Sequence, residues 1–364
     1  MHRNNLTAIM FAIYLTSQRA FAFQHHFKSL TRALGTRSSA QASISEEERY
    51  LFDIEGFLVV KNVFSKDEVA AANRAVDAHG HELKERRGAL RNTKTGTTLS
   101  GDGKTGRRDL AGMLGWPSPE SDFFRSVLAH PKLVPYYHAF LGEGYRMDHL
   151  PLVLTQRGGA EGFHLHGGPI DDLGNPDFYL TYDVKREVQR TSLLAVAVQL
   201  TPVEAGSGGF CVVRGSHKAN FRVPESLVHG DPNFLSHLHQ PELEPGDVVM
   251  WTEATAHGSL ARATEAPERR TALFRFAPSN IAYARTYSPS WPAEILAGLS
   301  EAQRSVLEPP YNNRLDRPFL KLDGLVDHEA DGHADPEGPL AVERQSRSAA
   351  KKKFDKDVFK TDYF

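Results

Sequence analysis

The chain has 364 residues, with 43 Lys and Arg against 45 Asp and Glu, and it contains one cysteine. A net charge of −2 gives no electrostatic reason to expect a nucleic acid or a membrane surface as a partner. One cysteine excludes an intramolecular disulfide and a zinc site built from cysteines. The unusual feature is the 17 histidines. Because histidine is the commonest metal ligand in proteins, their spacing indicates where a metal site can lie.

Residues 1–45 are predicted to be a targeting presequence. Basic residues precede the apolar run Leu6–Leu15, which has the length of a signal-peptide core and is too short to span a bilayer. The chain from there to Ser45 is basic, rich in Ser and contains no acid, as in a transit peptide. The combination resembles the bipartite presequences of algal secondary plastids. We expect transport to the plastid through the secretory pathway, with secretion as the alternative, and no stable membrane anchor after processing.

The first part of the body is predicted to be helical with one strand. A short helix from Tyr50 ends at Gly56 and is followed by a buried strand to Phe64. Ser65 and Glu68 form a capping-box pattern that opens a helix over Val69–Glu85. Residues 86–108 are polar and rich in Gly and basic residues, so we expect an exposed loop there. A further helix is predicted over Phe123–Leu141.

The second part of the body has the texture of a β-protein. Short runs rich in Val, Leu and aromatic residues alternate with turn residues. These runs are Tyr145–Leu154, Gly162–His166, Ser192–Leu200, Gly209–Arg214, Asp247–Trp251 and Arg270–Phe276. The run 193–200 is apolar on both faces, as in a central strand. Helices followed by many strands predict a mainly β fold with supporting helices, a helix-supported barrel.

The C-terminal segment 327–364 is polar and ends in a basic, Ser-rich stretch, so it is predicted to be a flexible tail. The chain is therefore divided into a presequence over 1–45, one domain over 46–326, and a tail over 327–364.

Three histidines have spacing that suits a metal site. His164 and His166 are two residues apart on a predicted strand, so they are expected to face the same side. His257 follows the predicted strand that ends at Trp251, and Arg270 opens the next strand. Two imidazoles with a further ligand and open positions suit a non-haem Fe(II), and an arginine nearby suits a dicarboxylate co-substrate. Structural histidines fit the same spacing.

The body also resembles the phytanoyl-CoA dioxygenase family of Fe(II)/2-oxoglutarate oxygenases over roughly residues 48–280. Three segments carry the resemblance: Gly56–Val69, Gly208–Lys218 with its Gly-Ser-His, and Pro245-Gly-Asp247 followed by His257 and Arg270. The resemblance implies a double-stranded β-helix (a cupin-like jelly roll). It further implies Fe(II), 2-oxoglutarate and O2 as reactants and a small organic molecule as the substrate.

The chain departs from the family at the carboxylate ligand, because no His-x-Asp occurs in this stretch. If His166 is the first ligand, Gly168 stands where the carboxylate belongs; this leaves a vacancy that chloride fills in related halogenases. If His164 is the first ligand, His166 makes a three-histidine site. A carboxylate from elsewhere is the third alternative, with Asp171, Asp172 and Glu253 as candidates. Loss of metal and activity is the fourth. The segment 165–169 resembles an algal and marine subgroup of the family, which favours His166.

Arg269 and Arg270 face opposite sides of their strand, so one of them reaches the pocket. The family spacing to Leu273 favours Arg270 as the residue that binds 2-oxoglutarate. The sequence thus predicts an oxygenase with His166 and His257 as metal ligands and His164 as a third in one alternative. The reaction is hydroxylation, or halogenation if chloride binds. The competing prediction is a metal-free β-barrel that binds a ligand without catalysis. The substrate and the oligomeric state are not indicated.

Overall fold

The computed structural model describes residues 44–86, 96–171, 173–177, 179–283, 291–310 and 318–327. The predicted presequence, apart from Ile44 and Ser45, and the predicted tail, apart from Asp327, lie outside the described residues. Within these ranges, no helix combines the length and the apolar character that crossing a membrane requires.

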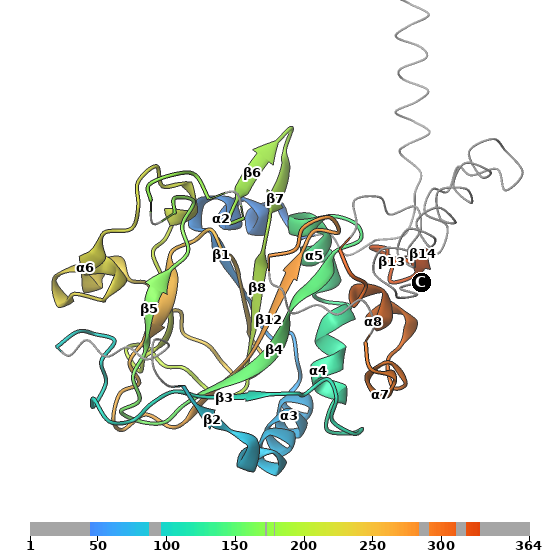
Figure 1. Cartoon of the computed structure of the whole chain (residues 1–364), viewed down its shortest axis with the longest axis horizontal. Helices are drawn as coiled ribbons and strands as arrows, with labels where there is room; N and C mark the ends of the chain where they lie inside the picture. The colour runs from blue at the N-terminus through green and yellow to red at the C-terminus, as the bar shows by residue number, and fades with distance from the viewer. Residues whose placement is uncertain are drawn as a thin grey trace, which may run out of the picture. The chain divides into compact units, whose positions relative to one another are not determined.

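Two antiparallel sheets face each other and form a double-stranded β-helix, which confirms the predicted fold class (Figure 1). The large sheet contains, in spatial order, β1 (Phe57–Val60), β10 (Val248–Thr252), β8 (Leu194–Gln199), β12 (Arg269–Ala277), β4 (Arg146–Gln156), β3 (Arg108–Ala111) and β2 (Lys84–Glu85). The small sheet contains β5 (Phe163–His166), β11 (His257–Leu260) and β9 (Gly209–Val212). Each strand predicted from 145 onwards is present, within a few residues of its expected bounds.

The large sheet separates two apolar cores, because successive side chains of a strand point to opposite faces. Strand β8 is buried at every position and lies between β10 and β12. Its Val196 and Val198 pack into the core shared with the helices. Its Ala195 and Ala197 face the space between the sheets. The small side chains on that inner face leave room for a pocket.

Most of the described α-helices lie on the outer face of the large sheet, away from β5, whereas α6 (Glu225–Val228) lies beside β5 (Figure 1). The helices on the outer face are α2 (Glu46–Glu55), α3 (Lys66–Ala78), α4 (Asp122–Ser126), α5 (Val134–Leu141), α7 (Ala293–Leu296) and α8 (Glu301–Val306). The predicted capping box of Ser65 and Glu68 opens α3. That helix ends at Ala78, close to Gly80, and not at Glu85.

The single helix predicted over 123–141 is wrong, because the chain there forms α4, a 3₁₀ helix over Val127–Ala129, and α5. His130 has the extended conformation (ψ 129°), which the following Pro131 imposes on it. The remaining described elements are the hairpin β6 (Tyr182–Lys185) and β7 (Val188–Thr191), and the pair β13 (Phe319–Leu320) and β14 (Val326–Asp327).

Candidate metal centre and anion pocket

Three side chains that could hold a metal ion meet between the sheets. His166 ends β5, His257 begins β11, and Glu253 lies in the turn between β10 and β11. Their ligand atoms all lie within 4.8 Å of one another. The two imidazoles approach from neighbouring strands, since His257 pairs with His166 in the ladder of the small sheet. Two imidazoles and a carboxylate with open positions are the donor set that non-haem Fe(II) prefers.

Both histidines present Nε2 to the shared centre. The Nδ1–H of His257 donates to the carbonyl oxygen of Thr255 at 2.7 Å, and His166 Nδ1 lies 3.3 Å from the carbonyl oxygen of His164. A hydrogen bond at Nδ1 fixes the proton there and leaves the Nε2 lone pair for a metal. The buried Nε2 of His257 has no hydrogen-bond partner among the described residues. The tautomers therefore fit metal binding.

The charges at the centre also suit a cation. Burial, and to a smaller extent the neighbouring His257, lowers the pKa of His166 to about 3. Burial likewise lowers the pKa of His257. Burial by itself would raise the pKa of Glu253, but Arg275 and the two imidazoles outweigh it and the pKa falls to about 2. At neutral pH the site therefore holds two neutral imidazoles and one carboxylate, the protonation state in which all three groups can bind a metal.

Glu253 is one of the three carboxylates that the sequence offers as a ligand in place of the aspartate of the family's His-x-Asp pair. One of its oxygens, Oε1, accepts a hydrogen bond from Nε of Arg275 at 2.6 Å. The other, Oε2, lies 3.4 Å from Nε2 of His257. Of the two alternatives, Asp171 caps its own turn by accepting from the backbone of Leu173 and Asn175, and Asp172 lies outside the described residues. The arrangement leaves Oε2 directed to the centre.

His164 does not share the side of His166, contrary to the expectation from simple alternation. The pairing of β5 with β11 shifts register between His257 and Ser259, which oppose His166 and Phe163. His164 and Leu165 of β5 therefore oppose the single residue Gly258 of β11. This arrangement is a β-bulge, and it interrupts the regular alternation of side chains along β5. Phe163 and His166 line the inner pocket, and His164 does not. His164 lines a neighbouring hollow, to which His166 also contributes, beside Arg222 and Val223. The structure thus groups Glu253, and not His164, with His166 and His257.

The two glycines after His166 allow the turn that carries Glu253 to approach β5. Gly167 has φ +86°, and a Cβ on it would lie 2.6 Å from the carbonyl oxygens of Glu253 and Thr255 and 3.2 Å from Nδ1 of His257. Gly168 has φ +108°, a backbone conformation that an L-aspartate would adopt only with strain. Gly168 thus stands where the family has its carboxylate ligand. The glycine backbone there allows the turn with Glu253 to bring a different carboxylate to the site.

We expect Gly167→Ala to displace the Glu253–His257 turn and to weaken metal binding by about tenfold or more, as changes beside metal ligands do. Gly174→Ala is the matched control, because Gly174 also has a positive φ (+83°) but a Cβ on it would meet no atom within 4 Å. Titration of both variants with Co(II), followed by its visible absorption, measures the effect. Equal affinities in the two variants would contradict the role given to Gly167.

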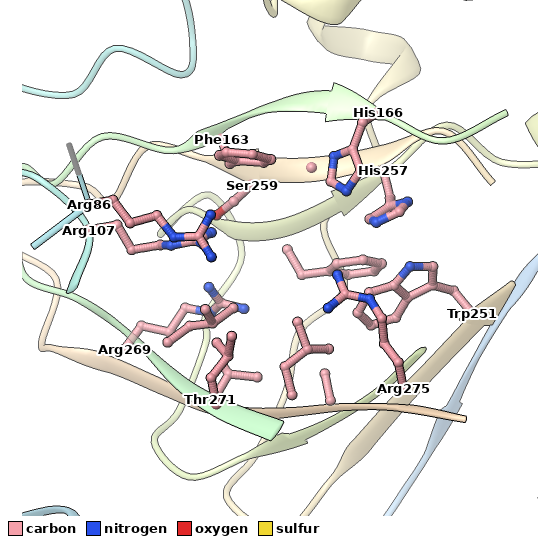
Figure 2. A pocket seen from close by; sticks show the side chains of 16 residues that line it. Arg86, Arg107, Phe163, His166, Trp251, His257, Ser259, Arg269, Thr271 and Arg275 are labelled. Atoms are coloured by element: carbon pink, nitrogen blue, oxygen red, sulfur yellow. The ribbon is translucent and has the colours of Figure 1, made fainter. Parts of the chain in front are cut away.

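A pocket extends from the two histidines into the space between the sheets (Figure 2). Four arginines reach into it: Arg86 beside β2, Arg107 beside β3, and Arg269 and Arg275 on β12. Arg275 lies at the metal end, paired with Glu253. The other three gather at the opposite end (Figure 2). The pocket thus has a metal end and an anion end.

Arg270, the predicted 2-oxoglutarate residue, does not reach this pocket. Alternation along β12 directs the side chains of Arg269, Thr271 and Leu273 inward. It directs Ala272 and Phe274 to the helix core, and Arg270 shares that side, where it pairs with Asp77 of α3 at 2.7 Å and with Glu268 at 2.9 Å. The structure therefore places Arg269, and not Arg270, in the pocket. The apolar residues Ala272, Phe274 and Phe276 lie in step with Arg270 along the strand. This pattern is the signal in the sequence that Arg270 faces the helices.

Arg269 is 3% exposed, and its Nη1 donates to Oε1 of Gln156 at 2.7 Å. Burial, and to a smaller extent the nearby Arg107 and Arg262, lowers its pKa to about 9. The hydroxyl-bearing residues Ser259 and Thr271 line the same end of the pocket. A buried guanidinium with hydroxyl groups beside it can bind a carboxylate through two hydrogen bonds.

Comparison with known proteins agrees with this architecture. The sequence profile of the phytanoyl-CoA dioxygenase (PhyH) family matches residues 52–271. HygX from Streptomyces hygroscopicus with nickel and 2-oxoglutarate bound is 22% identical, with a TM-score of 0.54 over 70% of this chain and 94% of that one. HygX with nickel, 2-oxoglutarate and hygromycin B bound is 21% identical, with a TM-score of 0.53 over 69% and 94%. These similarities concern the fold. No curated protein matches the chain.

Proposed function

Since the chain belongs to the phytanoyl-CoA dioxygenase family, we propose that it is a non-haem Fe(II)- and 2-oxoglutarate-dependent oxygenase. Its substrate is a small organic molecule, and its reaction is hydroxylation. The observation that carries the proposal is the cluster of His166, Glu253 and His257 at one end of a pocket whose other end is cationic. HygX, which has the same fold, binds nickel, iron and 2-oxoglutarate.

In this proposal His166, His257 and Glu253 are the residues that would hold the iron. Iron together with 2-oxoglutarate would supply the oxidising chemistry of the reaction. The chain's own residues orient these reactants. Thr255 holds the ring of His257 through Nδ1, and Arg275 holds Glu253 through its other oxygen. Such outer contacts keep ligands in place before the metal arrives.

The co-substrate would bind with one carboxylate at the metal end and the other on Arg269. Ser259 and Thr271 line the pocket beside Arg269, where their hydroxyl groups donate to Oε1 of Gln156 at 3.2 Å and to Oε1 of Gln199 at 2.9 Å. The inner face of the pocket between these ends is lined by apolar side chains, including Leu154 and Leu273. An apolar wall excludes water and strengthens the charge pairing at the guanidinium.

Hydroxylation is favoured over halogenation by the position of Glu253. A halogenase needs a ligand position that chloride can take, and here a carboxylate faces that centre from the turn before His257. The carboxylate is ionised at neutral pH, so it repels a second anion at the same place. The metal-free alternative predicts that the protein binds neither metal nor co-substrate.

Anaerobic addition of Fe(II) and 2-oxoglutarate tests the proposal. The expected result is the weak visible charge-transfer band of the chelate, which His257→Ala abolishes and which chloride does not shift. Under O2, succinate is expected to form. If the wild-type protein gives no band, and His257→Ala changes nothing, the protein is not an oxygenase. A chloride-dependent shift of the band would instead support halogenation.

A further inference from the structure

The anion end of the pocket holds more guanidinium groups than one carboxylate requires. Arg86 and Arg107 point into the cavity from the side of β2 and β3, and Arg269 points toward them from β12 (Figure 2). The charges are close enough to interact, since Arg107 contributes to lowering the pKa of Arg269. Like charges brought together without an anion destabilise the fold. The three groups therefore mark a place built for anions.

In the part of the chain that the structure describes, Asp109 is the one carboxylate that pairs with any of these arginines. It contacts Nε of Arg86 and lies 3.2 Å from Nε of Arg107. Arg269 instead contacts the neutral Gln156. Three positive charges against one negative charge leave an excess of two. The distal carboxylate of 2-oxoglutarate, the anion required by the proposed function, neutralises one of them.

The remaining charge is buried. Arg107 is 7% exposed, and burial lowers its pKa to about 10. Within the described residues, Nε of Arg269 lacks a hydrogen-bond partner, and Nε of Arg107 makes an ion-pair contact with Asp109 at 3.2 Å but no well-directed hydrogen bond. A buried donor without a partner costs free energy, which a bound oxyanion removes by accepting its hydrogen bond.

Arg86 and Arg107 also form a separate surface from Arg269. Their guanidinium carbons lie 5.5 and 5.2 Å from the centre of the Phe163 ring, so both groups rest against the same aromatic side chain. That ring lies 5.3 Å from the ring of His166. The side chains of the pair thus rest against the small sheet through Phe163, whereas Arg269 approaches from β12.

We propose that Arg86 and Arg107 bind an oxyanion of the substrate, a carboxylate, sulfate or phosphate group, while 2-oxoglutarate occupies Arg269. The substrate is therefore an acid, held by its charged group at the anion end of the pocket, where Arg86 and Arg107 rest against Phe163. This inference rests on the proposed function, because it assigns the second of two anions to the same pocket.

Titration of the protein loaded with Fe(II) and 2-oxoglutarate, without O2, tests the inference by calorimetry. Sodium sulfate and sodium acetate are added in separate arms at low ionic strength, which distinguishes a sulfate- or phosphate-like group from a carboxylate. At least one anion is expected to bind saturably while the charge-transfer band of the chelate persists. Arg107→Gln is expected to weaken that binding by about tenfold or more, the loss of one charge-assisted hydrogen bond.

The matched control is Arg108→Gln, because Arg108 is the next residue and pairs with Glu268 at 3.2 Å instead of lining the pocket. It is expected to bind the anion as the wild type does. Arg86→Gln is the second variant, in case Arg107→Gln does not fold; its side chain is 19% exposed. It is expected to weaken anion binding in the same way.

Three results would overturn the inference: neither anion binds the loaded protein, the anion displaces 2-oxoglutarate, or Arg107→Gln weakens 2-oxoglutarate binding as much as Arg269→Gln does. The last result would mean that all three arginines bind one carboxylate. Failure of the proposed function is distinguishable, because then the charge-transfer band is missing before any anion is added.

Discussion

Replacement of Glu253 by glutamine is expected to lower the affinity for Fe(II) by about 100-fold or more, the upper end of the range for changes around a metal site. The amide keeps the shape of the side chain, and its oxygen can still accept from Arg275. It has no charge, however, and a neutral oxygen is a much weaker ligand for a divalent ion. Co(II) titration followed by visible absorption, together with the iron content of purified protein, measures the loss without depending on activity.

Glu253→Gln leaves Arg275 as a largely buried charge without its partner, and breaking a buried pair costs about 3–5 kcal/mol. The double variant Glu253→Gln with Arg275→Gln removes both charges and keeps the test usable if the single variant unfolds. Glu268→Gln is the control, since Glu268 also pairs with an arginine of β12, Arg270 at 2.9 Å, but does not line the pocket. Wild-type metal affinity in Glu253→Gln would mean that two histidines suffice.

Replacement of Arg269 by glutamine is expected to raise the dissociation constant of 2-oxoglutarate by about 100-fold, since two charge-assisted hydrogen bonds contribute about 1.5 kcal/mol or more each. Metal binding is expected to persist, because Arg269 lies at the opposite end of the pocket from the histidines (Figure 2). Titration of the Fe(II) protein with 2-oxoglutarate, followed by the charge-transfer band, measures the change. Arg269→Lys should give an intermediate value, because lysine keeps the charge but not the planar pair of donors.

Arg270→Gln is the matched control for that experiment. Its partners Asp77 and Glu268 are on the helix side of the sheet, so 2-oxoglutarate binding is expected to match the wild type. The stability loss should be about 0–1 kcal/mol, as for other solvent-accessible ion pairs. A large loss of 2-oxoglutarate affinity in Arg270→Gln, with none in Arg269→Gln, would restore the choice based on family spacing.

Both experiments concern residues that sequence reasoning assigns with most difficulty. The strands are predictable, because runs such as 193–200 and 145–154 carry a pattern set by local burial. His166 and His257 are also identifiable from the sequence, since each lies at the end of such a run. Glu253 is one of three candidate carboxylates, and no local signal separates it from Asp171.

The choice among those candidates depends on contacts between distant segments. Whether Glu253 faces the centre is decided by the close approach of its turn to Gly167, a contact between residues far apart in the chain. The β-bulge opposite Gly258 similarly moves His164 out of the site, because a register shift arises from pairing with another strand. The sequence predicts Arg107 and Arg86 in an exposed loop. Arg107 is buried and Arg86 half-buried because β2 and β3 join the edge of the large sheet.

The histidine spacing by itself indicates His166 and His257, at the ends of two strands of a β-barrel, as candidate metal ligands, and structural histidines fit the same spacing. Local alternation also determines that only one of Arg269 and Arg270 can reach the pocket. Which of the two does so, which carboxylate completes the metal site, and how many cations share the anion end are decided by the tertiary structure. The physical reason is that strand pairing and close backbone approach set the direction of each side chain, and both depend on partners remote in the sequence.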